Sequence, residues 1–144
     1  MKVERVDQID IDVKNLDEAE RLFSDLGITF ERIKVVGKST RVLTEHADKA
    51  FEEAQLKVAM SPIGLSLIET VPPLEKEGLR ALDLKVSDLE QAKARMKSKG
   101  IRKLADVTMG DFKQAIYHPD DCHGVRLCLR EYKAPNALSA IRGK

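Results

Sequence analysis

Tryptophan is absent from the sequence, and the other aromatic side chains are four phenylalanines and two tyrosines in 144 residues. So few rings leave little surface on which nucleic-acid bases can stack. Charge of one sign is also missing, because 25 basic and 24 acidic side chains nearly cancel. The net charge therefore supplies none of the attraction that draws proteins to nucleic acid or to anionic membranes, and neither partner is expected.

Cysteine is scarce as well. Cys122 and Cys128 are the only two, too few and too close together for a disulfide framework. No apolar run approaches the roughly 20 residues that span a bilayer. The first residues, MKVERVDQID, carry charges where a signal peptide has its apolar region. We therefore expect a soluble protein in the reducing cytoplasm.

What the sequence does contain is an internal repeat. Residues 6–28 and residues 79–101 align without a gap, at an offset of 73 positions. The matched positions include Val13 with Val86, Leu16 with Leu89, Ala19 with Ala92, Gly27 with Gly100 and Ile28 with Ile101. A repeat of this length predicts two copies of one structural unit.

Each copy begins with alternating residues, the period of a half-buried strand. One face of these strands is apolar, formed by Ile9, Ile11 and Val13 and by Leu82, Leu84 and Val86. The other face carries Gln8, Asp10 and Asp12 and, in the second copy, Ala81, Asp83 and Lys85. A helix follows each strand. Its expected start is a capping pair, Asn15 with Glu18 or Asp88 with Gln91, and its expected end is Gly27 or Gly100.

Further strands are predicted in both halves. They cover about 30–36, 40–44, 56–61 and 64–70, then 103–108, 112–118 and 124–131, with a short helix inserted over 44–54. The expected organisation is a βαβββ module over 1–70, a linker over 71–78, a second module over 79–132, and a C-terminal tail over 133–144. One module of about 65 residues buries too little alone, so the two should join their sheets. The tail is expected to be frayed or packed on a neighbour.

Three segments carry a family resemblance: VDQIDIDVKNLDEA, GLRALDLKVSDLEQAKARMKSKGI and IYHPDDCHGVRLCLREY. They resemble the vicinal oxygen chelate superfamily, most of all its methylmalonyl-CoA epimerase and glyoxalase branch. The resemblance extends to about Tyr132 and is weakest over 30–56. It implies an α+β fold in which two tandem βαβββ modules close into one cup-shaped, eight-stranded mixed sheet. The superfamily includes epimerases, lyases, dioxygenases and metal-free sequestering proteins, so it indicates the fold more narrowly than the function.

Members of that family hold a divalent metal through four side chains that face the cup. The resemblance places those positions at Gln8, Ser66, Ala81 and Cys128. Gln8 can ligate, but Ser66 is a poor ligand while neutral, Ala81 has no donor, and Cys128 suits only a soft metal. The usual divalent-metal site is therefore lost and the cofactor is unknown. A shifted strand register that turns Glu69 inward, or a rearranged site built from Gln8, Asp10 and Asp83, would be needed to restore one.

The side chains that face the cup instead offer acids beside bases. Asp10 and Asp83 are related by the repeat, which should place them across the cup from each other, and they are the candidate catalytic residues. One alternative is that they serve structure alone, lining a wet groove or pairing with Lys85, Arg126 and Arg130. The functional alternative is that one or both act as general base, with a pKa raised by burial or by the other's charge. The candidate substrate-binding residues are Gln8, Lys85, Arg126, Cys128 and Arg130.

Two functions follow from this reading. The first is an isomerase, epimerase or lyase that removes a proton from a small substrate containing a carboxylate or carbonyl group. The alternative is a metal-free small-molecule binding protein or a non-catalytic partner subunit. A strongly perturbed aspartate favours the enzyme, because plain binding does not need one. A homodimer is expected, since a partner usually covers the edge strands of such modules.

Overall fold

The computed structural model describes residues 1–34, 40–48, 55–72 and 76–143. The first half contains β1 (Val3–Asp12), α1 (Leu16–Ser24), β2 (Glu31–Ile33), β3 (Thr40–Thr44), β4 (Gln55–Ser61) and β5 (Leu65–Val71). The second half contains β6 (Gly78–Val86), α3 (Leu89–Ser98), β7 (Lys103–Met109), β8 (Phe112–Tyr117), the 3-10 turn Pro119–Asp121, β9 (Arg126–Glu131) and α4 (Ala137–Arg142).

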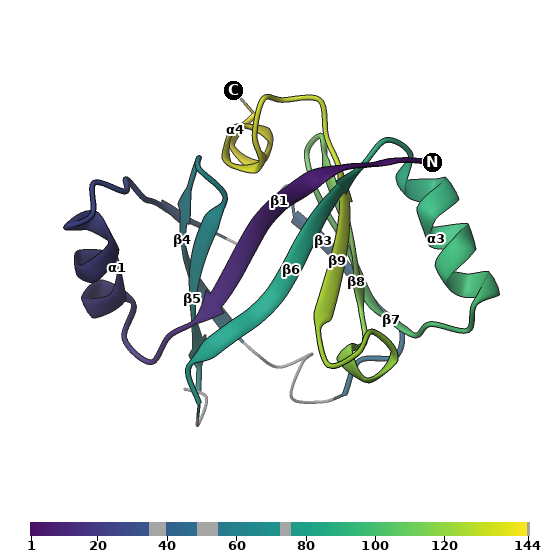
Figure 1. Cartoon of the computed structure of the whole chain (residues 1–144), viewed down its shortest axis with the longest axis horizontal. Helices are drawn as coiled ribbons and strands as arrows, with labels where there is room; N and C mark the ends of the chain where they lie inside the picture. The colour runs from purple at the N-terminus through teal and green to yellow at the C-terminus, as the bar shows by residue number, and fades with distance from the viewer. Residues whose placement is uncertain (35–39, 49–54, 73–75, 144) are drawn as a thin grey trace.

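All the described strands join one curved sheet, in the order β2-β4-β5-β1-β6-β9-β8-β7-β3. The two strands of the repeat, β1 and β6, lie antiparallel at its centre. Each also pairs in parallel with the last strand of its own half, β5 or β9. The sheet curls around a concave face, while α1 and α3 cover its outside (Figure 1). This arrangement confirms the predicted α+β fold with a cup-shaped mixed sheet.

The strand count differs from the expected eight, because β3 is a ninth strand. It follows β2 in the sequence but pairs antiparallel with β7 of the second half, with Val42 opposite Val107. The sequence pattern predicted a strand over 40–44, but the repeat gave no partner for it, since the second copy has no equivalent segment. Its physical role is to hydrogen-bond the edge of β7, which would otherwise be exposed at the end of the sheet.

Both helices of the repeat begin as predicted. Asn15 Oδ1 accepts a hydrogen bond from the Glu18 amide at 2.9 Å, and Asp88 Oδ1 accepts one from the Gln91 amide at 3.0 Å. Both helices are followed by a glycine with positive φ, at +86° and +73°, respectively. These local contacts fix where each helix leaves its strand.

A second carboxylate supports each helix start from the sheet. Glu69 Oε2 accepts from the Leu16 amide at 2.7 Å, and Glu131 Oε1 accepts from the Leu89 amide at 2.9 Å. Because β5 pairs with its neighbours without a bulge, Glu69 lies on the helix side of the sheet. The alternative in which Glu69 turns into the cup is therefore wrong.

Residues 137–142 of the C-terminal tail form a helix that packs on the chain's own sheet rather than a frayed end. Helix α4 buries Ala137, Leu138 and Ala140 against the cup's apolar end, which is formed by Met60, Val107, Met109 and Phe112. Its far end is tied to β2, where Arg142 Nε lies 2.5 Å from Glu31 Oε2. Helix α4 thus spans the cup near one end (Figure 1). The expectation of a loose tail failed because this short apolar face matches an apolar patch made by distant strands.

The inserted helix expected over 44–54 is only partly testable. Thr44 ends β3, residues 45–48 are not helical, and residues 49–54 lie outside the described part of the chain. Among the described helices, none has the length and apolar character needed to cross a bilayer.

Candidate functional site

The polar face of the two central strands is the buried one. Gln8, Asp10 and Asp83 are 3%, 8% and 0% exposed, whereas Ile9 on the opposite face of β1 is 42% exposed. Strand pairing arranges the concave face in rows. One row is Asp10, Ala81 and Arg126; the next is Gln8, Asp83 and Cys128. Lys85 and Arg130 stand side by side in the row after that.

Arg130 occupies the centre of this polar floor, and every one of its N–H groups has a partner. Nε and Nη2 both donate to Gln114 Oε1, the former at 2.9 Å. Nη1 lies 2.5 Å from Gln8 Oε1 and 3.3 Å from Asp7 Oδ2. Nη2 also lies 2.8 Å from Asp83 Oδ2. In this arrangement Arg130 has no donor left for a ligand, so it organises the site from within.

Asp10 and Asp83 are neighbours rather than opposites. The repeat's pseudo-symmetry suggested that they lie across the cup, but β1 and β6 pair directly, which places both carboxyl groups on adjacent strands within interaction distance. Burial, followed by the negative charge of Asp83 and a hydrogen bond with it, raises the pKa of Asp10 well above its usual range.

The geometry supports a shared proton. With both groups ionised, neither oxygen of Asp83 has a well-aligned hydrogen-bond donor, even though both are buried. A proton on Asp10 supplies that donor and removes the repulsion between two carboxylates. The two carboxyl groups are thus buried rather than set in an open groove, and Asp83 pairs with Arg130, one of the predicted basic partners.

The other predicted site residues, Lys85, Cys128 and Arg126, differ in their exposure and charge. Lys85 is held at the rim, where Nζ is 2.5 Å from Glu4 Oε2 and 5.1 Å from the Tyr132 ring centre. Cys128 is 3% exposed, and burial raises the pKa of its thiol well above its usual value, which keeps the sulfur neutral. Burial and then the charge of nearby Arg80 lower the pKa of the Arg126 guanidinium.

These residues do not fit the divalent metal of the family. Ala81 offers no donor, the Gln8 carbonyl oxygen is taken by Arg130, and the Cys128 thiol is far from its thiolate form. Ser66 has a buried hydroxyl without a partner but is a weak ligand while neutral. No group of three acidic, His or Cys side chains within the described ranges is arranged to hold a metal ion. No chemistry is therefore assigned to a metal here.

Sequence reasoning missed Asp7, Gln114 and Tyr132. Gln114 pairs with Arg130 across β8 and β9, and strand alternation along β8 could have found it. Asp7 is different, because a bulge between Val6 and Gln8 turns it toward the buried side. Its carboxylate accepts from the Tyr132 hydroxyl at 2.6 Å. Sequence alternation cannot reveal a residue that a bulge turns over.

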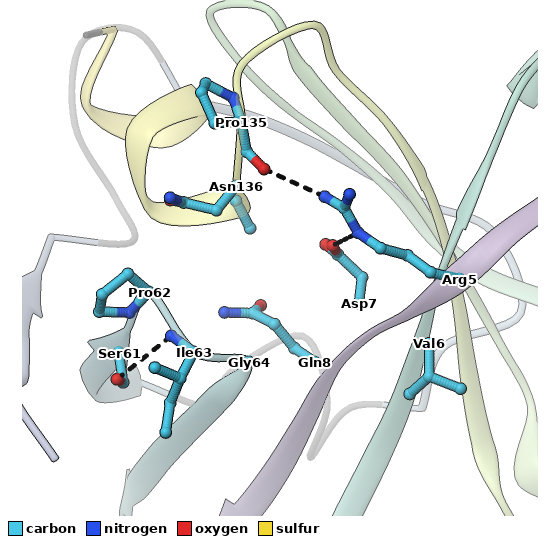
Figure 2. Close-up of a pocket in the computed structure, with 11 residues that line it drawn as sticks. Arg5, Val6, Asp7, Gln8, Ser61, Pro62, Ile63, Gly64, Pro135 and Asn136 are labelled. Carbon is cyan, nitrogen blue, oxygen red and sulfur yellow. Dashed lines mark hydrogen bonds and ion pairs between the residues drawn. The ribbon is translucent and has the colours of Figure 1, made fainter.

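A pocket of about 200 Å³ opens beside Gln8, on the side away from Asp10. Its walls are the start of β1, the Ser61–Gly64 turn and the beginning of α4. Figure 2 shows Gln8 reaching from β1 toward that turn, with Asn136 above it and Arg5 and Asp7 on the β1 side. The C-terminal segment is thus part of the wall.

No protein-family model matches the sequence, and no curated protein matches it significantly. Solved structures do match. Streptomyces coelicolor methylmalonyl-CoA epimerase in complex with 2-nitronate-propionyl-CoA has a TM-score of 0.65 at 23% identity, over 92% of this chain and 100% of that one. Methylmalonyl-CoA epimerase from Mycobacterium tuberculosis has 0.59 at 19%, over 92% and 90%. A hypothetical protein from Bacillus halodurans C-125 has 0.59 at 16%, over 90% and 95%.

At these identities the likeness establishes the fold. The chain has the fold of these methylmalonyl-CoA epimerase structures, in line with the fold that the repeat motifs predicted. On this fold the acid pair of Asp10 and Asp83 and the buried Arg130 lie beside Gln8, Ala81 and Cys128, three of the positions that the resemblance assigned to metal ligands.

Proposed function

We propose that the protein is an acid–base isomerase or epimerase of a small substrate that contains a carbonyl or carboxylate group. Asp10 and Asp83 are its proton carriers. The observation that carries this proposal is the raised pKa of Asp10, caused by burial and by the charge of Asp83. One protonated carboxyl beside one carboxylate is the pair of states that proton removal and return at carbon require.

The row that contains Ala81 supports a position for the substrate. Asp10 and Arg126 stand on either side of this small residue, on strands that are each about 4.8 Å from the central one. A substrate above Ala81 would have its acidic C–H near Asp10 and its carbonyl oxygen near Arg126. The small side chain of Ala81, where the resemblance places a metal ligand, would thus leave room for the substrate.

The chemistry balances without a metal. Once the proton of the pair has passed to Asp83, the Asp10 carboxylate beside the substrate removes the proton next to the carbonyl group, and the C–H electrons move onto oxygen as an enolate. The charge of Arg126 stabilises that oxygen. After the enolate turns over above Ala81, return of a proton from Asp10 to the other face of the carbon gives the epimer, with no net proton gained or lost. Expulsion of a leaving group from the same enolate would instead make the enzyme a lyase.

Structural neighbours narrow the first substrates to test. One matching structure is described as methylmalonyl-CoA epimerase in complex with methylmalonyl-CoA and NH4+, with a TM-score of 0.65 at 22% identity, over 94% of this chain and 99% of that one. An acyl thioester that carries a carboxylate is therefore the leading candidate. Free 2-substituted malonates and 2-oxo acids share the acidic C–H and are the next class.

The test is solvent deuterium exchange at the substrate carbon, followed by NMR or mass spectrometry. We expect exchange in the wild type and a loss of at least about 100-fold in Asp10→Asn, the usual size of a general acid–base contribution. Asp106→Asn is the control, because Lys93 and Lys103 pair this carboxylate at 3.0 and 2.6 Å elsewhere on the sheet. An absence of exchange with every substrate, or equal rates in both variants, contradicts the proposal.

Shielding of the acid pair favours a second candidate, a metal-free binding protein. Asp83 is 0% exposed and α4 crosses one end of the cup. A binding protein would be stabilised by a small carboxylate or phenol without exchanging its protons. Thermal stabilisation by ligands that show no deuterium exchange would therefore support this candidate over the enzyme.

A second copy of the chain is the partner that we propose. Large apolar side chains lie exposed on the convex face of β1 and β6, among them Val6 at 59%, Ile9 at 42% and Leu79 at 63%. Contiguous apolar surface on central strands is typical of an interface, and a two-fold dimer would pair this face with itself.

A further inference from the structure

We infer that the pocket beside Gln8 is a separate binding site for a small oxyanion, a carboxylate or a phosphate. This inference goes beyond the proposed function, because it concerns the opposite side of Gln8 from the acid pair and holds even if that pair catalyses nothing.

The orientation of the Gln8 amide is fixed by chemistry. An arginine can only donate hydrogen bonds, so the atom of Gln8 that meets Arg130 Nη1 at 2.5 Å has to be the carbonyl oxygen. The amide nitrogen of Gln8 is therefore the atom that Arg130 leaves without a hydrogen bond. It forms no hydrogen bond with any residue that the structure describes, and the side chain is only 3% exposed. In Figure 2 this nitrogen points toward the Ser61–Gly64 turn, into the pocket.

The orientation of the Asn136 side-chain amide, on the facing wall of the pocket, is also fixed by a hydrogen bond. Its Oδ1 accepts a hydrogen bond from the Ser139 amide at 2.9 Å, so the oxygen is used as the cap of α4. The Nδ2 group is left as a donor at the pocket wall. Two amide N–H₂ groups of fixed orientation thus border one pocket without an acceptor among the described side chains.

The charges around the pocket favour an anion. Arg5 donates from Nε to Asp7 at 3.0 Å and from Nη2 to the Tyr132 hydroxyl at 2.9 Å and the Pro135 carbonyl at 3.2 Å. Its Nη1 remains available at the rim. Asp7 is the only carboxylate among the lining residues, and Arg5, Arg130 and Tyr132 together surround it with donors. The pocket therefore has spare donors and a neutralised carboxylate.

Size restricts the ligand further. The volume of about 200 Å³ lies below the roughly 300–1,000 Å³ of pockets that hold drug-sized molecules. Pro62 and Ile63 supply the apolar part of the wall. A mono- or dicarboxylate of a few carbons, or inorganic phosphate, matches this space and the three donors.

Isosteric variants can remove each pocket donor while they keep the hydrogen bond that the same side chain accepts. Asn136→Asp keeps the oxygen that caps α4 but replaces the pocket donor with a second oxygen. Gln8→Glu likewise keeps the acceptor for Arg130 and removes the donor. Calorimetric titration of the wild type with succinate, with inorganic phosphate and with neutral succinamide should show binding of one or both anions only. Each variant should weaken anion binding at least about tenfold, the loss expected for one hydrogen bond to a charged group.

Asn15→Asp is the matched control, because it makes the same change at the cap of α1, away from the pocket. We expect it to leave anion affinity unchanged. The inference is overturned if the wild type binds neither anion at millimolar concentrations, if succinamide binds equally well, or if the three variants behave alike. The ratio of succinate to phosphate affinity identifies which oxyanion is preferred. The deuterium-exchange test with Asp10→Asn fails or succeeds independently of these titrations.

Discussion

Arg130 Nη2 lies 2.8 Å from Asp83 Oδ2, in the floor of a cup where both side chains are almost fully buried. The guanidinium is the fixed positive charge of this concave face. Asp83 and Asp10 overcome the effect of burial and raise the pKa of Arg130, so the positive charge is secure. The chain supplies this charge from β9.

Removal of this cation should be costly. Arg130→Met leaves the buried Asp83 carboxylate without its counter-charge and leaves Gln8 and Gln114 without their donor. We expect the free energy of unfolding to fall by about 3–5 kcal/mol, as when one partner of a buried ion pair is removed. Urea denaturation followed by circular dichroism measures this. Asp83→Asn combined with Arg130→Met should be more stable than Arg130→Met alone, and a further loss in the double variant would contradict the pairing.

The acid pair should also make stability depend on pH. An unfolded aspartate has a pKa of about 3.9, and burial and Asp83 raise the pKa of Asp10 in the folded protein. Between these two values the folded state binds more protons than the unfolded state, so stability falls as pH rises. The slope for one proton reaches about 1.4 kcal/mol per pH unit. Above the pKa of Asp10 in the folded protein, this dependence of stability on pH disappears.

Comparison with Asp10→Asn isolates that slope. The difference in the free energy of unfolding, wild type minus variant, should decrease steadily as pH rises above about 4. Denaturation at a series of pH values gives this difference directly. A difference that stays constant with pH would mean that Asp10 ionises normally in the folded protein.

Two features of Gly64 make any substitution there destabilising. Its φ is +96°, and a Cβ built there would lie 2.9 Å from the backbone oxygen of Asp7. Gly64→Ala should therefore lose about 1–2 kcal/mol from the backbone conformation, and more from displacing β1. Gly110→Ala is the control, since φ is +59° but nothing lies within 4 Å of its Cβ. Equal changes in melting temperature for the two variants would show that the close approach costs nothing.

The convex face gives a prediction about oligomeric state. Leu79→Glu should convert the proposed dimer into a monomer, because it places a charge on the exposed apolar face. Leu26→Glu is the control, since Leu26 is more exposed, at 73%, but follows α1. Sedimentation velocity distinguishes the species. A monomeric wild type would remove the dimer proposal.

Much of the fold could be predicted because it depends on local signals that occur twice. The capping residues, the glycines that follow each helix and the alternation of each first strand all act within a few residues, so the sequence displays them directly. The inward side of Asp10 and Asp83 followed from the same alternation. Their direct contact did not, because it depends on which strands of the two modules become neighbours.

Features that depend on distant partners escaped prediction for the same reason. The Asp7 side chain faces the site only because of a bulge against β6. Helix α4 is six residues long, too short to be stable alone, and forms where the cup offers apolar contacts. The acceptors of the Arg130 hydrogen bonds could not be assigned from sequence, since Gln114, Gln8 and Asp7 come from two different strands and meet only in the closed sheet.

The pairing of β3 with β7 connects the two halves of the chain. A strand that lies inside the first half in sequence completes the edge of the second half, so a cut between residues 72 and 78 would separate a segment from the partner it covers. Two fragments made at that cut would have to exchange a strand in order to reassemble. The duplicated halves have therefore become interlocked, and neither is a self-contained copy of the ancestral unit.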